Sequence, residues 1–302
     1  MSEQNQNNLP SDHTLIRVIN EVSSNAVIRQ DLMKKLTTLT GRKVISYISS
    51  MYPHPIAFIN DWDAETIENI LRSYGKVDKL DLIIHSSGGF AESAERIVNS
   101  IYSYCDDFRI IIPTQAKSAA TMVAMGASSI LMSDTSEIGA IDPQLPTGIA
   151  AQSVIKAYEE LKQKIDEKQK QQQPYDTELI SISKIDPILL RECRKYMGLA
   201  KDIALKLLNK KMLSDKPMSI SDIETRFLDD GQTFSHGRLI NHLEAEKLGL
   251  KIEYVDKFDE KWKIIWEIYI RSKVAVSQHN FSKIIEDEKY SLQAGNLPIR
   301  QG

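Results

Sequence analysis

Short apolar runs alternate with segments of helical period between residues 44 and 132. The predicted strands are 44–49, 80–85, 108–113 and 128–132, and the predicted helices between them are 63–74, 91–104 and 118–127. Asp63 is the expected N-cap of the first of these helices. Strands that alternate with helices predict parallel strands joined by right-handed crossovers. The chain is therefore expected to have an α/β fold.

The pattern changes after Pro146. Residues 151–173 are charged and end in KQKQQQP, which fits either a long solvated helix or a linker. A second helical stretch is expected over 187–213, and the tail after about residue 275 is expected to fray because it has few apolar residues.

Three regions follow from this reading. Residues 1–35 are a polar N-terminal arm and a helix that begins near Asp12. Residues 36–255 are the α/β domain, with a charged helical insertion at about 151–213. Residues 256–302 are a C-terminal helix and tail. Within the last region, 262–270 (WKIIWEIYI) is short and carries charges, which favours an amphipathic docking helix over a membrane span.

Composition excludes several classes of function. The 302 residues carry 38 Lys and Arg against 41 Asp and Glu, so no basic excess points to nucleic acid. No run of about 18 apolar residues predicts an integral membrane segment. The polar N-terminus lacks the apolar core of a signal peptide, so a cytoplasmic location is expected. Cys105 and Cys193 are expected to be reduced thiols, and no metal or cofactor is expected.

Three motifs follow successive strands: HSSGG (85–89), AKSAATMVAMGA (116–127) and SEIGAIDPQLP (136–146). Ligands of open α/β sheets gather beyond the carboxyl ends of strands, where all three would lie. Adjacent glycines allow a sharp turn with exposed amides. Ser118 would open a helix, whose free N–H groups suit an oxyanion. Each motif alone is typical of a turn, a cap or a loop; their order and spacing favour a site.

The runs LDLIIHSSGGFAESAERIVNSIYS and AKSAATMVAMGASSILMSDTSEIGAIDPQ resemble the ClpP-class peptidases. AKSA, IGAIDPQ and the later FSHGRLINHLEAEKLGL are similar in particular to the serine dehydrogenase proteinase family, a relative of signal peptide peptidase SppA. The resemblance covers roughly residues 40–255. It implies a ClpP/crotonase-like fold, a repeated ββα spiral with parallel strands, here extended by helices at both ends.

The resemblance also implies roles for individual residues. Ser118 aligns with the nucleophile of a serine hydrolase, while Gly89 and Ala119 align with the two backbone donors of an oxyanion hole. The substrate would be a peptide or protein that adds as a β-strand beside the glycine segment. The alternatives are a crotonase-like acyl-CoA enzyme and a catalytically weak or inactive scaffold protein.

The general base is where the sequence departs from ClpP, because Asp142 stands where ClpP has a histidine. SppA-like relatives use a lysine, which must be desolvated to be neutral near pH 7. Lys156 is the leading candidate, because Val154, Ile155 and Ala157 flank it. The other candidates are His236 and the later lysines 162, 164, 168 and 170.

Lys117 adjoins the nucleophile, but its side chain is expected to point away from that of Ser118. A homo-oligomer is expected, with the amphipathic segments 187–213 and 258–274 as its contact surfaces.

Overall fold

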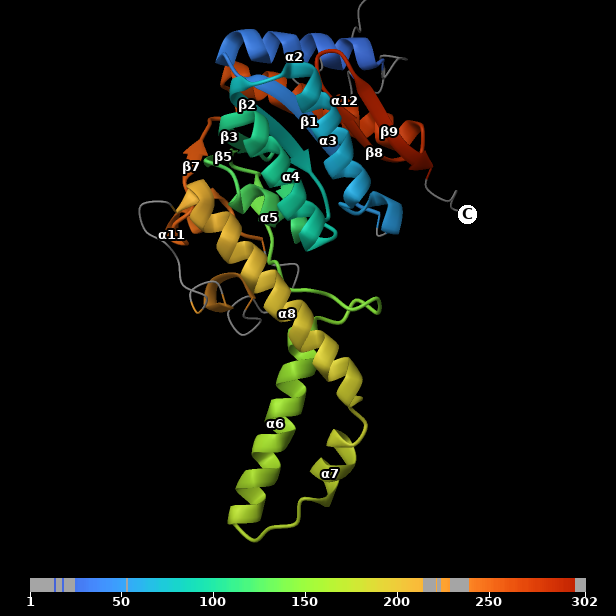
Figure 1. The fold of residues 1–302 in the computed structure, drawn as a ribbon, viewed down its shortest axis with the longest axis vertical. Helices are drawn as coiled ribbons and strands as arrows, with labels where there is room; N and C mark the ends of the chain where they lie inside the picture. The colour runs from blue at the N-terminus through green and yellow to red at the C-terminus, as the bar shows by residue number, and fades with distance from the viewer. Residues whose placement is uncertain are drawn as a thin grey trace, which may run out of the picture.

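A seven-stranded sheet forms the centre of the computed structural model, which describes residues 14, 18, 25–52, 54–213, 221, 224–228 and 239–296. The strand order is β7-β5-β3-β2-β1-β8-β9 (Figure 1). The first five pair in parallel, whereas β8 and β9 run antiparallel. The strands are β1 Lys43–Ser49, β2 Val77–His85, β3 Cys105–Ile111, β5 Ser129–Met132, β7 Ile252–Tyr254, β8 Phe281–Glu286 and β9 Ser291–Asn296. The expected α/β fold is confirmed.

Helices cover both faces of the sheet (Figure 1). One face carries α3 Asp61–Tyr74, α4 Ala91–Tyr104 and α5 Ala119–Met125, and the other carries α2 Ala26–Thr40 and α12 Glu260–Gln278. Side chains alternate between these layers: Leu82 and Ile84 of β2 lie in the first core, and Ile83 lies in the second. Burial on both faces explains why 80–85 is a continuous apolar run.

A second row of short extended segments lies beyond the carboxyl ends of the long strands. It contains β4 (Gln115–Ala116) and β6 (Glu137–Ile138), which pair in parallel. Isolated bridges extend the row from Ile59 to Gly89, from Ser86 to Ala116 and from Ile138 to Ile240. Successive turns of the chain thus contribute a long strand, a short extended segment and a helix, which is the ββα repeat that the resemblance implied.

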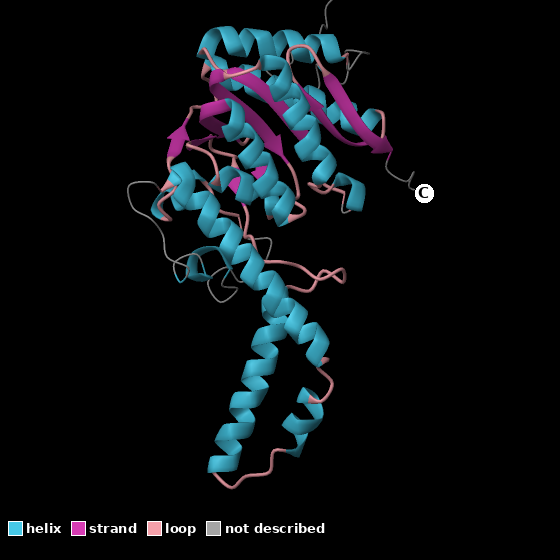
Figure 2. Cartoon of the chain, viewed as in Figure 1, coloured by secondary structure: helices cyan, strands magenta, loops and turns pink. Residues whose placement is uncertain are grey.

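A helical arm projects from the sheet (Figure 2). It consists of α6 Ala151–Lys170, α7 Asp176–Ile182 and α8 Pro187–Leu207, which continues as η2 Leu208–Met212. The question left open for 151–173 is settled by α6, a helix as far as Lys170. The remaining described elements are η1 Pro55–Ala57, η3 Glu224–Leu228 and α11 His242–Lys247.

Two expectations about local structure are wrong. Asn60, not Asp63, is the N-cap of α3, and Asp63 accepts the Asn60 backbone N–H in a capping box. The described part of the tail, up to Asn296, does not fray, because β8 pairs with β1 and forms a hairpin with β9. The helix expected from Asp12 lies mostly outside the described residues. The docking helix at 262–270 is part of α12, whose side chains are buried against this chain's own sheet.

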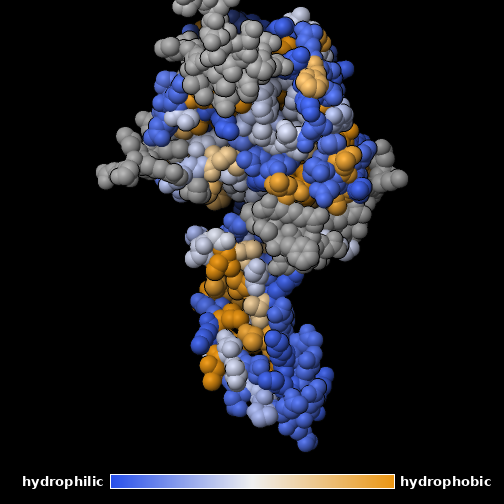
Figure 3. Space-filling model, turned by 180° about the vertical axis from the view of Figure 1, so that it is seen from behind, coloured by the Kyte–Doolittle hydropathy of each residue, from blue (hydrophilic) through white to orange (hydrophobic). Residues whose placement is uncertain are grey.

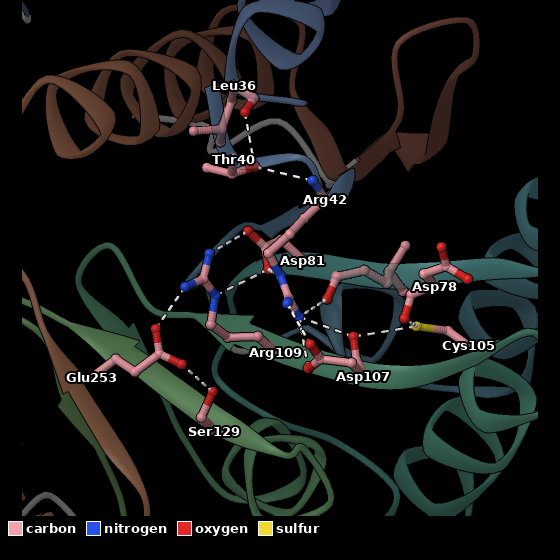
Figure 4. Close-up of polar contacts among 11 residues, drawn as sticks. Leu36, Thr40, Arg42, Asp78, Asp81, Cys105, Asp107, Arg109, Ser129 and Glu253 are labelled. Carbon is pink, nitrogen blue, oxygen red and sulfur yellow. Dashed lines mark hydrogen bonds and ion pairs between the residues drawn. The ribbon is translucent and has the colours of Figure 1, made fainter. Parts of the chain in front are cut away.

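A buried ion cluster ties the strands together on the α2 and α12 side (Figure 4). Asp81 of β2 is fully buried, and Nε and Nη2 of Arg109 donate to its two oxygens at 3.0 and 2.7 Å. Arg42 also donates to Asp81, and its other nitrogens reach Asp107 at 2.8 and 3.1 Å. Arg109 reaches Glu253 of β7 at 2.6 Å. Asp81 therefore bridges the two guanidinium groups, and each of them also pairs with a second carboxylate, Asp107 or Glu253.

Asp81→Asn is expected to lower the free energy of unfolding by about 3 kcal/mol, because it removes the fully buried carboxylate to which both guanidinium groups donate. Urea unfolding measures the change. Asp107→Asn is the matched control: its side chain is 43% exposed, so a loss below about 1 kcal/mol is expected. Equal losses in the two variants would contradict the central place of Asp81.

Candidate active site

Ser118 lies at the sharp turn between β4 and α5, with φ 48° and ψ −119°. A positive φ is strained for a side chain other than glycine, and neighbouring contacts must hold it. Three backbone hydrogen bonds do so: Lys117 N–H to Ser86 O at 3.0 Å, Ser118 N–H to Ala140 O at 3.2 Å, and Met122 N–H to Ser118 O at 3.1 Å. Ser118 is half-buried and has the strand-to-helix elbow expected for a nucleophile.

The glycine pair lies directly against this elbow. A Cβ built on Gly88 would lie 2.6 Å from the Lys117 carbonyl oxygen, 2.6 Å from the Ser118 Cβ and 3.0 Å from the Ala119 nitrogen. Gly88 also has φ 102°, which favours glycine. Residue 88 must therefore be glycine for the turn to approach Ser118 so closely. The motif HSSGG predicts a sharp glycine turn here, but the sequence assigns an individual role only to Gly89, not to Gly88.

Two backbone N–H groups beside Ser118 are without an acceptor among the described residues. The Ile59 backbone pairs with Gly88 O and Phe90 N–H, so the Gly89 N–H points away from Ile59. Ala119 is the first residue of α5, and its N–H has no side-chain cap. The structure thus brings Ser118, Ala119 and the glycine pair together, with two donors left for an oxyanion.

Thr121 holds the backbone on both sides of the Ser118 turn in place. Its fully buried hydroxyl donates towards Ala116 O at 2.9 Å and Gly139 O at 3.1 Å. It therefore connects the two short strands β4 and β6 from inside α5. Small residues at 119 and 120 let α5 pack directly over this connection, since both are buried.

The candidate bases lie at different places. Lys156 is half-buried near the start of α6, and the Ala151 N–H that begins α6 donates to Pro143 O at 2.8 Å. Asp142 is 7% exposed in the same loop. His236 lies outside the described residues. No hydrogen bond joins the Ser118 hydroxyl to a side chain in the part of the chain that the structure describes. Free enzymes often form such bonds fully only with substrate, so the geometry leaves these candidates in place.

Lys117 turns towards β6, where its Nζ lies 2.8 Å from a carboxylate oxygen of Glu137. His85, at the end of β2, faces the α12 layer. Its ring lies edge-on to Tyr269 at 5.0 Å, and Nδ1 lies 2.8 Å from the Thr114 hydroxyl. Burial, with the charge of Lys273, lowers the pKa of His85 to about 3. His85 is therefore neutral near pH 7 and lies on the face opposite α5 and Ser118.

Among the described residues, no group of three or more His, Cys, Asp or Glu side chains is arranged to hold a metal ion. Within the same residues, no helix combines the length and the apolar character that crossing a membrane requires.

The motifs and this geometry agree with comparison to known proteins, which points to ClpP-like serine proteinases. A family model for ClpP-like SDH-type serine proteinases matches residues 15–254, so the chain belongs to that family. The resemblance seen in the motifs is thereby confirmed.

Two uncharacterized proteins of Methanocaldococcus jannaschii are similar to this chain. One is 27% identical over 231 residues, which cover 74% of this chain and 73% of the relative. The other is 28% identical over 174 residues, which cover 55% of this chain and 57% of the relative. A solved ClpP1 mutant from Listeria monocytogenes aligns over 76% of this chain and 99% of its own, with a TM-score of 0.41 and 13% identity.

Proposed function

We propose that this chain is a serine peptidase that cleaves peptide bonds through an acyl-enzyme on Ser118, without metal or cofactor. The observation that carries the proposal is the strained Ser118 elbow packed against the glycine turn, where the N–H groups of Gly89 and Ala119 have no acceptor among the described residues. Strain at a residue of this kind is typical of a functional site. Membership of a serine proteinase family supports the same chemistry.

In the proposed reaction, Ser118 Oγ attacks the substrate carbonyl carbon and gives its proton to a neutral base. The Gly89 and Ala119 N–H groups stabilise the oxyanion that forms. The C–N bond then breaks as the base returns the proton to the leaving amine, and Ser118 is left as an ester. Water, deprotonated by the same base, attacks the ester and regenerates the hydroxyl.

Lys156 is the proposed base, in the manner of the SppA-like Ser–Lys enzymes. Its helix α6 begins at the loop that contains Ala140, whose carbonyl accepts the Ser118 N–H. Val154 and Ile155 pack against the main core, which draws this part of α6 towards the domain. Lys156 as a residue is half-buried, and a lysine can serve as the base only where desolvation keeps its amine neutral.

Lys156→Ala and Lys156→Arg are both expected to lower the hydrolysis of fluorescently labelled casein by about 10²-fold to 10⁴-fold. Arginine keeps the positive charge but stays protonated, so it cannot act as the base. Lys162→Arg, at an exposed position on the same helix, is the matched control and should retain activity. Activity in Lys156→Arg would contradict the assignment, and Asp142→Asn would then be the next variant to measure.

A homo-oligomer is part of the proposal, with the arm as the contact surface. Ile180 of α7 and Ile188 of α8 are 60% and 63% exposed, and Tyr196 and Leu199 lie exposed further along α8. Figure 3 shows apolar side chains gathered along the arm. An exposed apolar surface of this kind is typical of a protein interface. The other expected segment, 258–274, is unsuitable because α12 packs on its own sheet.

Light scattering at micromolar concentration should give a mass above that of one chain. Ile180→Asp combined with Ile188→Asp should lower it to the monomer, because two charges would be buried at the contact. Exposed Val27→Asp on α2 is the control and should leave the mass unchanged. A monomeric mass for the unmodified chain would contradict the proposal.

The expected cytoplasmic location is also retained in the proposal. Cys105 and Cys193 are buried and are not joined in a disulfide, which fits a reducing compartment.

A further inference from the structure

Lys283 of β8 forms a buried ion pair with Asp63 of α3. The Nζ to Oδ2 distance is 2.8 Å, and the two side chains are 1% and 0% exposed. The Tyr47 hydroxyl of β1 also donates to Oδ2 at 3.2 Å. Burial lowers the pKa of Lys283 and raises the pKa of Asp63, while the attraction between the partners opposes both shifts. An ion pair this deep contributes little net stability compared with apolar residues, so a role other than stabilisation is worth seeking in what the two side chains contact.

The pair holds two backbone groups of one short segment. Lys283 Nζ donates to the Phe58 carbonyl oxygen at 2.8 Å. The Asn60 N–H donates to Asp63 Oδ2 at 2.8 Å. These two groups flank Ile59 on either side in sequence. The ion pair therefore hydrogen-bonds to one side of the extended segment 58–60.

The other side of that segment holds the glycine turn. Ile59 N–H donates to Gly88 O at 2.8 Å, and Phe90 N–H donates to Ile59 O at 2.9 Å. The C=O and N–H of one trans peptide group point in opposite directions, so the ion pair and the glycine turn hold opposite sides of the same two peptide groups, 58–59 and 59–60. A Cβ built on Gly89 would lie 2.3 Å from the nitrogen and oxygen of Ile59, so the segment 58–60 and the glycine turn are packed backbone against backbone. A shift of Ile59 must move the Gly89 peptide.

We propose that Lys283, paired with Asp63, is a positioning residue that fixes the Gly89 N–H as an oxyanion donor, acting through the segment 58–60. This inference rests on the proposed peptidase function. Lys283 lies beyond residues 15–254, the part of the chain matched by the family model. The β8–β9 hairpin thus contributes to the site although it follows the family's matched region.

Lys283→Met tests the proposal, because it keeps the length of the side chain and removes the donor. Hydrolysis of p-nitrophenyl acetate should show kcat about 10-fold to 100-fold lower, as expected for a displaced transition-state group. KM should change less than 3-fold, about the limit expected when ground-state binding is kept. A hydrogen-exchange measurement should show faster exchange of the Ile59 and Phe90 amides, which donate the two hydrogen bonds to the turn.

Arg29→Met is the matched control. Arg29 forms a buried ion pair with Glu286 of the same strand at 2.6 Å, but it reaches that strand from α2, on the face of the sheet opposite α3. It should destabilise the hairpin to a similar degree while kcat and exchange at Ile59 and Phe90 stay unchanged. If Lys283→Met does not fold, the double variant Lys283→Met with Asp63→Asn removes both charges, and the same two results are expected of it.

The outcomes separate the inference from the function on which it rests. A folded Lys283 variant with unchanged kcat, or with lower kcat but unchanged exchange at Ile59 and Phe90, overturns the positioning role. An equal kcat loss in Arg29→Met overturns it too, because the effect would then come from general destabilisation. If the unmodified chain hydrolyses no ester and no casein, the proposed function fails, and the exchange measurement alone decides whether Lys283 holds the turn.

Discussion

Ser118→Ala is expected to lower casein hydrolysis by at least about 10³-fold, since the attacking oxygen is lost while the oxyanion donors remain. The free energy of unfolding should stay within about 1 kcal/mol of the unmodified chain. The Ser118 hydroxyl makes no side-chain cap hydrogen bond, so its removal leaves no buried partner unsatisfied among the residues that the structure describes. The backbone strain at φ 48° is the same for alanine as for serine. Urea unfolding and an activity assay on one preparation measure both effects.

Ser87→Ala is the matched control for this result. Its hydroxyl is buried beside the same glycine pair and makes no hydrogen bond to a described residue, so its loss should leave activity within about 3-fold. Retained casein hydrolysis in a clean preparation of Ser118→Ala would contradict the nucleophile assignment.

Gly89→Ala should lower activity by about 10²-fold to 10³-fold, the range expected when one oxyanion donor is lost. The added Cβ would lie 2.3 Å from the backbone nitrogen and oxygen of Ile59, a distance that no side-chain movement can relieve. The Gly89 peptide must therefore move away from Ile59, and its N–H moves with it. Because the donor acts on the transition state, the loss should fall on kcat rather than on KM.

Gly148→Ala is the control that separates this contact from ordinary backbone strain. Gly148 has φ 80°, and a Cβ there would meet nothing within 4 Å. It should cost about 1 kcal/mol of stability and leave kcat unchanged. An unchanged kcat in folded Gly89→Ala would rule out Gly89 as an essential donor.

The sequence predicted the sheet because the chain's apolar runs are buried on both faces. Residues 80–85 are apolar throughout since Leu82 and Ile83 enter different cores. The motifs of the site could also be predicted from the sequence. Gly88 adopts a positive φ that favours glycine, and Ser118 adopts a positive φ that costs energy. These features depend on local sequence, so one chain without relatives could reveal them.

The hairpin of β8 and β9 could not be predicted in this way. Its buried positions include Lys283 and Glu286, which an apolar pattern counts as exposed. Their partners are Asp63 and Arg29, which lie more than 200 residues earlier in the chain. The N-cap of α3 is a different case: Asn60 is the cap and Asp63 is its capping-box partner three residues on, a pattern that the local sequence does carry. Charges that are buried against distant partners defeat periodicity.

Labelling with a fluorophosphonate probe tests the nucleophile most directly. The probe forms a covalent bond with an activated serine oxygen and needs no knowledge of the natural substrate. Mass spectrometry of the digested protein should find the adduct on Ser118, with no adduct in Ser118→Ala and slower labelling in Gly89→Ala. An unlabelled Ser118 in the folded, unmodified chain, or labelling at another serine, would contradict the peptidase proposal and favour an inactive scaffold.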